Sequence, residues 1–352
     1  MSSSARPRPV EFGPWRRPVR FARVSGFVNT RSVLIGVVAT IVAAAAFVAA
    51  VSLGKYSVPF AETLQILRGV DTGFSATVVL EWRLPRAVAA LGFGAALGIS
   101  GAIFQSVTRN PLGSPDVIGL SAGAFTGVLC AMAWFETPLA VTVSALLGGL
   151  AAGLIVYVVA YRKGLSGARF VVVGIAVSAA LTAINQMLLL RMSTATATTA
   201  SIWAQGTLVE VRWESVTPVL CIILLLCCVV VPLAPALGQL ELGDNAAAST
   251  GVRVERARLA LLCLGILLTA VVTSITGPIA FVALVAPQLA RLLSGAAGAT
   301  LLGSAATGAL LLSVSDVVSA HLFPASVPVG VVTAVIGGVY LLWLIIAKAR
   351  QR

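Results

Sequence analysis

The sequence predicts an all-α polytopic membrane protein of about ten transmembrane helices with an inverted internal repeat. Of its 352 residues, 59% are hydrophobic and only 10% are charged, whereas a soluble domain carries roughly 25% charged residues. Apolar runs recur along the chain, and several reach the roughly 20 residues that a helix needs to cross a bilayer. A short Gly- and Pro-containing pattern also occurs twice, far apart in the chain.

The first 32 residues differ from the rest of the chain, because they are polar and rich in Arg and Pro. We expect residues 1–32 to be a basic, mostly disordered cytoplasmic tail that lies against anionic lipid headgroups. No small-residue cleavage site follows the first apolar run, which argues against a secretory signal peptide. The transmembrane domain is expected over residues 33–348.

Polar segments separate the expected spans. Segment 54–82 is amphipathic and is expected to be external, either interfacial or re-entrant. Segment 191–217 carries Trp203 and Trp213, which suit a membrane interface. The eighth span is too short for an ordinary crossing. The expected spans are about 33–53, 84–107, 117–135, 139–160, 170–190, 216–234, 259–277, 285–294, 299–321 and 329–347.

The distribution of positive charge orients these spans. An even number of crossings places both termini on one side, and most of the 24 Lys and Arg residues fall on that side. The positive-inside rule makes this side cytoplasmic. The exceptions are Lys55, Arg68, Arg83, Arg86, Arg191 and Arg212 on the other side, and Arg291 within the short span.

The repeated pattern aligns without a gap. Residues Ser100–Ile103 match Thr276–Ile279, and Pro111 matches Pro287 at the same offset. With ten spans, we expect the two copies to run in opposite directions through the membrane. Helices that Gly and Pro interrupt commonly line the pathway of a transporter. The alternative, that small residues only let helices pack closely, is preferred for scattered glycines such as Gly148.

Several motifs occur in a fixed order along the chain. They are Arg83-Leu-Pro-Arg86, Gly101 to Gln105, Asn110-Pro-Leu112, Gly119, Gly277-Pro-Ile-Ala-Phe281, Pro287-Gln288-x-x-Arg291 and Val327-Pro-Val-Gly-Val-Val-Thr333. In these motifs, residues 33–348 resemble the FecCD family, the permeases of type II ATP-binding cassette (ABC) importers for iron-siderophores and vitamin B12. The resemblance implies a ten-helix bundle that dimerises, with the transport pathway at the dimer interface.

The same resemblance implies a function. The chain would be the permease subunit that moves a ferric siderophore from an external binding lipoprotein into the bacterial cytoplasm, with the iron carried inside the siderophore. Gln288 stands where the family commonly has His, and this resembles the ferric-enterobactin-type permeases. It favours a ferric siderophore over haem or cobalamin, and a heterodimer with a second permease over a homodimer.

The energy source is expected on another chain. The sequence has no Gly-x-x-x-x-Gly-Lys-Ser/Thr phosphate loop, so ATP and Mg²⁺ would be bound by a separate ABC ATPase dimer. No cofactor is expected on this chain.

Arg83 and Arg86 are three residues apart at the external end of the second span, and are expected on one helical face. The resemblance implies that they pair with acidic residues of the binding protein, because an Arg fork grips a carboxylate with two hydrogen bonds. The alternative is headgroup anchoring. The family often has another arginine near the external end of the ninth span. That region here contains His321, which we group with the docking residues.

Loop 238–258 has the pattern of a short capped helix. Asp244 is expected to accept hydrogen bonds at its start, and Gly251 to close it in the left-handed conformation. An ordinary solvated loop is the alternative. The resemblance matches this loop to the coupling helix that sits in a cleft of the ATPase, where consecutive alanines would allow close docking. The coupling residues are Gly243, Asp244, Ala246, Ala247, Ala248, Thr250, Gly251 and Arg253.

The pathway and its inner gate are assigned to the motif residues near the two repeat copies. Neutral and small groups suit a large ferric complex that must leave as well as enter. Asp316 is the acid inside a span, and we expect a structural, hydrogen-bonded role for it rather than proton coupling. The pathway residues are Gly101, Gln105, Asn110, Pro111, Gly277, Pro278, Pro287, Gln288 and Arg291.

Other classes of protein fit the sequence less well. The basic residues form no patch interleaved with aromatics, which argues against nucleic-acid binding. The sequence shows no paired carboxylates and no nucleophile with a base, so no catalytic residue is assigned. The five cysteines lie in apolar runs without metal-ligand spacing, so we expect packing thiols and no metal site. An ion-driven carrier built on the same repeat is the remaining alternative.

Overall fold

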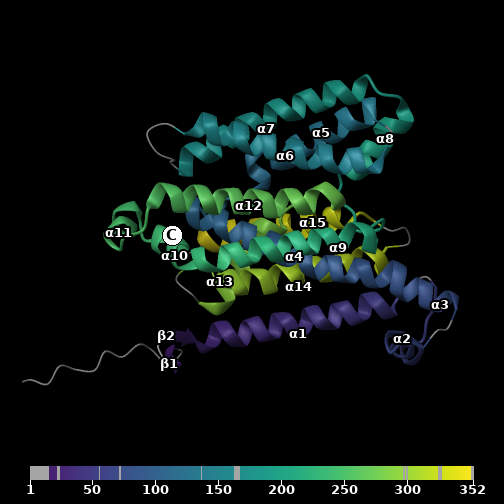
Figure 1. Cartoon of the computed structure of the whole chain (residues 1–352), viewed down its shortest axis with the longest axis horizontal. Coiled ribbons are helices and arrows are strands. Elements are labelled where there is room, and N and C mark those ends of the chain that lie inside the picture. Colours follow the sequence, from purple (N-terminus) through teal and green to yellow (C-terminus); the bar gives the residue numbers. More distant parts are fainter. Residues whose placement is uncertain are drawn as a thin grey trace, which may run out of the picture.

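The computed structural model shows a bundle of long, roughly aligned helices (Figure 1). It describes residues 16–21, 24–54, 56–70, 73–135, 137–161, 167–295, 298, 300–323 and 327–349. Residues 1–15, 22 and 23 of the expected tail, and the basic residues Lys55, Arg162, Lys163, Arg350 and Arg352, lie outside the described residues.

Ten helical segments account for the expected spans within the described residues. Eight helical stretches are long and apolar enough to cross a membrane, and two shorter apolar helices, α5 and α13, complete the set. This confirms the prediction of about ten spans; α13 is short as expected, and α5 is also shorter than the predicted span over 117–135. The helices are α1 (Thr30–Ser52), α4 (Leu84–Thr108), α5 (Leu120–Trp134), α6 (Pro138–Ala160), α7 (Gly167–Leu190), α9 (Trp213–Val230), α12 (Val254–Thr276), α13 (Val282–Ser294), α14 (Leu301–His321) and α15 (Val329–Ala349).

Short elements gather at the two ends of the bundle (Figure 1). Helices α2 (Phe60–Leu67), α3 (Phe74–Thr77) and α8 (Thr194–Trp203) lie at one end. Helices α10 (Ala234–Glu241) and α11 (Asp244–Ser249) lie at the other end, together with the start of α1. These ends correspond to the external and cytoplasmic sides that the sequence predicts, and we call them the outer and inner ends.

Within the expected tail, residues 16–21 and 24–29 differ from the disordered expectation. Strands β1 (Arg16–Phe21) and β2 (Val24–Asn29) pair there as an antiparallel hairpin, with Arg16 opposite Asn29. The hairpin leads directly into α1 at the inner end of the bundle (Figure 1). High Arg and Pro content therefore did not prevent local strand pairing.

Helix α4 is the centre of the bundle and is longer than the sequence predicted. It continues from α3 through a π-helical turn, η1 (Val78–Arg83), so that Phe74–Thr108 is one uninterrupted helix. Its buried face packs closely on α14, where a Cβ on Gly98 would lie 2.0 Å from the Ser304 carbonyl oxygen. Only glycine permits this approach, and small residues at helix interfaces are how membrane helices come close.

The two copies of the repeated pattern have different local structures. Ser100–Ile103 is part of the continuous helix α4, whereas Gly277–Phe281 is the non-helical break between α12 and α13. Gly101 approaches Ala283, and Pro111 contacts Gln288, so α4 and α13 run side by side in the same direction. Helices α4 and α12, which carry the two copies, run in opposite directions, because the end of α4 and the start of α12 both pair with Asp244. This agrees with the expected inverted repeat, and α13 turns back after the break to run alongside α4.

Candidate functional site

At the outer end, Arg83 is held by the end of the first span. Its guanidinium donates to the carbonyl oxygens of Val51 at 3.2 Å, Ser52 at 3.1 Å and Tyr56. The Val51 and Ser52 carbonyls belong to the last turn of α1, where a helix leaves backbone acceptors without intrahelical partners, and Tyr56 follows the helix. Arg83 thus binds the carboxyl end of α1 within the same chain.

Arg86 points to a different neighbour, Asp316 of α14. Its Nε and Nη2 donate to Asp316 Oδ1 at 2.9 and 2.8 Å. The Asp316 side chain is only 3% exposed and that of Arg86 is 21% exposed. A buried carboxylate needs such a partner, and the two-pronged geometry is the strongest that Arg offers. Asp316 therefore has the hydrogen-bonded position at the outer end that the sequence suggested.

A cavity of about 290 Å³ at the outer end brings the three expected docking residues together. Arg83, Arg86 and His321 all line it, along with Trp82 and Asp316. His321 is exposed, and its Nδ1 lies 2.9 Å from the Val317 carbonyl oxygen. Arg83 and Arg86 line this cavity together, and both already have hydrogen-bond partners within the chain. Their docking role stays a prediction.

Near the inner end, a polar network joins α4 to α13. Gln105, which is 2% exposed, donates through Nε2 to the Leu284 carbonyl oxygen at 2.8 Å. Its Oε1 accepts from Arg291 Nη2 at 2.5 Å. Gln105 is thereby fixed by two bonds to one neighbouring helix, and the Arg291 charge has a partner inside the bundle.

The loop after α4 joins the same network. Gln288 donates to the Pro111 carbonyl oxygen and accepts from the Tyr340 hydroxyl at 3.0 Å. Asn110 Oδ1 accepts from the Leu112 backbone N–H at 2.9 Å, which closes the turn locally. The expected gate residues Gln105, Pro111, Gln288 and Arg291 are therefore brought together, and Asn110 lies beside them.

The break between α12 and α13 is built by glycine and proline. Gly277 has a φ of 71°, and a Cβ there would lie 2.1 Å from the Trp203 carbonyl oxygen. The Thr276 carbonyl oxygen accepts instead from the Thr207 backbone N–H at 2.7 Å. The Thr276 carbonyl at the end of α12 thus has a hydrogen-bond donor in the segment after α8. Pro278 follows, where a helical N–H is not required.

A proline inside α13 allows a second close contact, between α13 and α4. Pro287 has no N–H, so it cannot donate to the Ala283 carbonyl oxygen four residues earlier. Helix α4 presents Gly101 to that carbonyl, and a Cβ at Gly101 would lie 1.7 Å from it. The pair lets α4 and α13 approach backbone to backbone, which explains why both residues are needed at this crossing.

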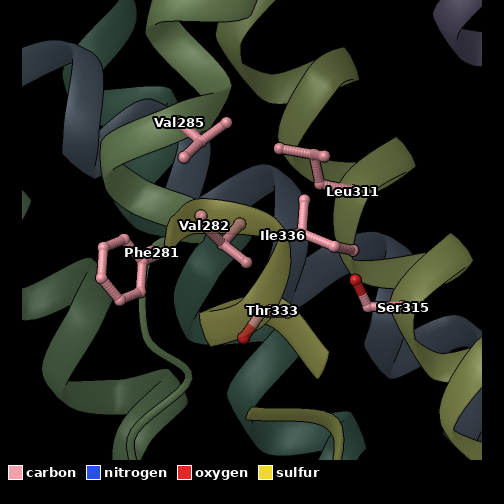
Figure 2. A pocket seen from close by; sticks show the side chains of 8 residues that line it. Phe281, Val282, Val285, Leu311, Ser315, Thr333 and Ile336 are labelled. Atoms are coloured by element: carbon pink, nitrogen blue, oxygen red, sulfur yellow. The ribbon is translucent and has the colours of Figure 1, made fainter. Parts of the chain in front are cut away.

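Phe281 starts α13 in the left-handed region, with a φ of 67°, which a bulky side chain rarely adopts. Figure 2 shows Val282 and Val285 facing Leu311 and Ile336 across a narrow pocket between α13, α14 and α15. Its volume of about 10 Å³ is roughly what one water requires. In this conformation the region is closed by side chains.

The short helix η2 (Asp116–Ile118) also touches the break. Asp116 accepts from the Ser121 hydroxyl at 3.3 Å. Burial raises the pKa of Asp116 to about 6, although hydrogen bonds from Ser121 and the Phe281 backbone oppose the rise. The segment after α4 thus contacts both α13 and the residue that starts it.

At the inner end, Asp244 connects three elements. It begins α11, and its carboxylate pairs with Arg109 after α4 and with Arg258 of α12, the latter at 2.6 Å. Arg258 is buried and also contacts Glu255 at 3.2 Å. The expectation that Asp244 caps α11 is wrong: Gly243 occupies the cap position, and no side-chain cap hydrogen bond forms there.

The other coupling residues surround α11. Gly251 has a φ of 86°, which agrees with its expected left-handed closing position. Thr250 donates to the Ala247 carbonyl oxygen at 2.8 Å, and Arg253 is exposed before α12. Ala247 is 0% exposed and packs in the main apolar core, whereas Ala246 is half-buried and Ala248 is exposed. Only part of the alanine run therefore faces solvent.

Sequence reasoning did not assign Tyr340, Arg109 or the Ser106–Glu241 hydrogen bond to these sites. It expected Arg258 to hold the loop at the inner surface, but it did not predict the pairing of Arg258 with Asp244 and Glu255. Tyr340 gave no signal, since its hydroxyl partner lies on another helix.

A bundle of about ten membrane-spanning segments, a broken helix beside α4 and a solvent-facing helix at the inner end define the class of a polytopic membrane permease. A model of the FecCD transport family matches residues 31–347. The chain therefore belongs to the FecCD transport family. Members are permease subunits of ABC importers, so the chain is a transport subunit and ATP hydrolysis belongs to a separate subunit.

Individual relatives agree with this assignment. The chain is 46% identical to the ferric enterobactin transport system permease protein FepG of Escherichia coli (strain K12), over 83% of this chain and 90% of the relative. It is 34% identical to the ferric enterobactin transport system permease protein FepD of the same organism, over 85% and 90%. A solved structure described as an inward-facing metal-chelate type ABC transporter matches with a TM-score of 0.77 and 26% identity, over 89% of this chain and 99% of that one.

Proposed function

We propose that this chain is one permease subunit of an ABC importer that carries a ferric siderophore, of the enterobactin type, from an external binding protein into the cytoplasm. The observation that supports this choice of cargo is the 46% identity to a ferric enterobactin permease over most of both chains. The presence of Gln288, hydrogen-bonded to the loop after α4, agrees with the same relationship.

The proposal includes a place and a partner. The chain spans the bacterial cell membrane with both termini in the cytoplasm, as its distribution of Lys and Arg favours. It pairs with a second, different permease, because two distinct permeases of one named transport system are both similar to it. An ABC ATPase dimer binds at α10 and α11, and an external binding lipoprotein binds at the outer end.

The gate is proposed at the contact between α4 and α13. Gln105, Gln288 and Arg291 hold the two helices together near the inner end, and the Gly277–Phe281 break gives α13 a hinge. Opening towards the cytoplasm requires these few hydrogen bonds to exchange partners. The network offers amide groups to the passing complex, and these bind weakly enough to release it.

Uptake in a strain deleted for this chain tests the cargo. Cells are given iron-labelled enterobactin, an iron-labelled hydroxamate siderophore, haem or cobalamin, with and without the gene restored. Restored uptake of the catecholate complex alone supports the proposal. Restoration of haem or cobalamin uptake without the siderophore contradicts it, and uptake that persists after deletion of the partner ATPase favours an ion-driven carrier.

Two substitutions test the ATPase contact. Ala248 is exposed on α11, so Ala248→Arg is expected to weaken ATPase binding in pull-down from membranes while the permease stays folded. Ala247 is unsuitable for this test, because it is buried and a bulky side chain there would disturb the core. Ser201→Arg, at an exposed position on α8 at the outer end, is the matched control. Equal ATPase binding by both variants would refute the assigned contact.

A further inference from the structure

Two independent side-chain links tie the end of α4 to the short inner helices. Ser106 donates to Glu241 at the end of α10, and Arg109 pairs with Asp244 at the start of α11. The partners in each link are 135 residues apart in sequence, so neither is a local contact. Helix α4 is therefore fastened to the segment that faces the cytoplasm at two successive points.

Asp244 also secures α11 to α12. Its Oδ1 accepts from Arg258 at 2.6 Å, and Arg258 is only 4% exposed. The buried guanidinium supplies a fixed anchor, whereas the Arg109 side chain is 43% exposed. A displacement of α11 would therefore move the Asp244 carboxylate, and Arg109 would move with it because the two side chains are paired.

The backbone conformation of Arg109 indicates that the arginine side chain is needed at this position. Arg109 adopts a left-handed conformation, with a φ of 50°, at the C-cap of α4. Non-glycine residues adopt this conformation uncommonly, and glycine is usual at such a position. The side chain at this position thus has a function that glycine could not supply.

The end of α4 leads directly to the gate. Gln105 lies one helical turn before Arg109 and binds Leu284 and Arg291 of α13. A continuous set of contacts therefore runs from α11 through Asp244 and Arg109 to α4, and from Gln105 to α13. Every connection is a hydrogen bond or ion pair between two different elements.

We propose that Arg109 is a positioning residue that couples α11 to the gate, so that movement of α11 by the ATPase is transmitted through Asp244 to the cytoplasmic end of α4. This inference rests on the proposed function, which supplies the ATPase.

The test compares Arg109→Gln, Arg109→Lys and Glu255→Gln in the assembled transporter in lipid nanodiscs. Glu255→Gln is the matched control, since it removes the other partner of Arg258 but leaves the α4–α11 link. Hydrogen exchange of peptides covering residues 105–112 is measured before and after trapping with ATP and vanadate. ATPase binding is measured on the same samples.

Wild type and Glu255→Gln are expected to change exchange on trapping. Arg109→Gln is expected to lose this response about fivefold, the scale of a coupling near 1 kcal/mol, and Arg109→Lys to retain part of it. Gln and Lys face the same backbone cost, so their difference isolates the charge. Equal responses in wild type and Arg109→Gln, or equal losses in Gln and Lys variants, would overturn the inference. Failure of the wild type to bind the ATPase would overturn the proposed function as well.

Discussion

The two ends of α4 use the same chemistry in opposite settings. At the outer end, Arg86 and Asp316 form a two-pronged pair in which the carboxylate is 3% exposed. At the inner end, Arg109 and Asp244 pair while their side chains are 43% and 48% exposed. The outer pair joins two long helices, α4 and α14, whereas the inner one joins α4 to the six-residue helix α11.

This difference in exposure indicates that the outer attachment of α4 is fixed and that its inner attachment can change. A buried ion pair is costly to break, because each charge left behind has lost its water. An exposed pair is worth 0–1 kcal/mol in typical cases and exchanges readily with solvent. We infer that α4 pivots about its outer attachment to α14 and is moved at its inner end.

The largest expected effect is from Arg86→Ala. It leaves Asp316 buried without its partner, so we expect a loss of about 3–5 kcal/mol in the free energy of unfolding. Asp316→Ala should cost less, since Arg86 can turn towards the outer cavity. Denaturant titration in mixed micelles measures both. A double variant, Arg86→Met with Asp316→Leu, should recover most of the loss, and equal stability of Arg86→Ala and wild type would contradict a fixed outer joint.

The steric fit between α4 and α13 gives an intermediate case. Gly101→Ala places a methyl group against the Ala283 carbonyl oxygen, and the helices must separate for it to fit. We expect destabilisation of about 1–3 kcal/mol, the usual range for overpacking. The control is Gly338→Ala, where a Cβ meets nothing within 4 Å. Similar stability of the two variants would show that this crossing is loose.

A smaller effect is expected from Arg109→Gln at the inner end. Because both side chains are about half exposed, the free energy of unfolding should fall by no more than about 1 kcal/mol. The difference from wild type should vanish near 1 M salt, where the screening length is about 3 Å. Denaturant titration repeated across salt concentrations checks this. A salt-independent loss would show that the inner pair is as protected as the outer one.

The smallest effect is expected from His321→Ala. The side chain is exposed and its ring nitrogen lies within hydrogen-bond distance of a backbone carbonyl of its own helix, so stability should change by less than about 0.5 kcal/mol. Affinity for the external binding protein should fall if His321 belongs to the docking surface. Surface plasmon resonance on nanodiscs measures that affinity. An unchanged affinity would remove His321 from the proposed surface and leave the outer joint unaffected.

The spans could be predicted because lipid imposes a simple requirement. A helix of about 20 apolar residues satisfies its own backbone, so composition and length reveal it. The short α13 was also predictable, since Gly277 and Pro278 interrupt the run and too few apolar residues follow. Gly251 was found for a similarly local reason, because a left-handed helix end favours glycine.

Partners across the bundle could not be predicted. Arg86 and Asp316 are 230 residues apart, and nothing in either local sequence indicates the other. Arg83 and Arg86 looked like one surface, but the π-helical turn ends between them and they bind different elements. In α11, three consecutive alanines have the same polarity and size, so the sequence does not indicate which of them is buried and which is exposed. The burial of Ala247 therefore emerges only from the fold.

The uninterrupted helix Phe74–Thr108 has a consequence for the surrounding membrane. Its 35 residues span about 52 Å, well beyond a hydrocarbon core of about 30 Å. A rod of fixed length adapts to a thinner or thicker bilayer by changing its tilt. A change of tilt about the outer attachment to α14 would displace the inner end of α4, so bilayer thickness is expected to change how readily the proposed gate opens.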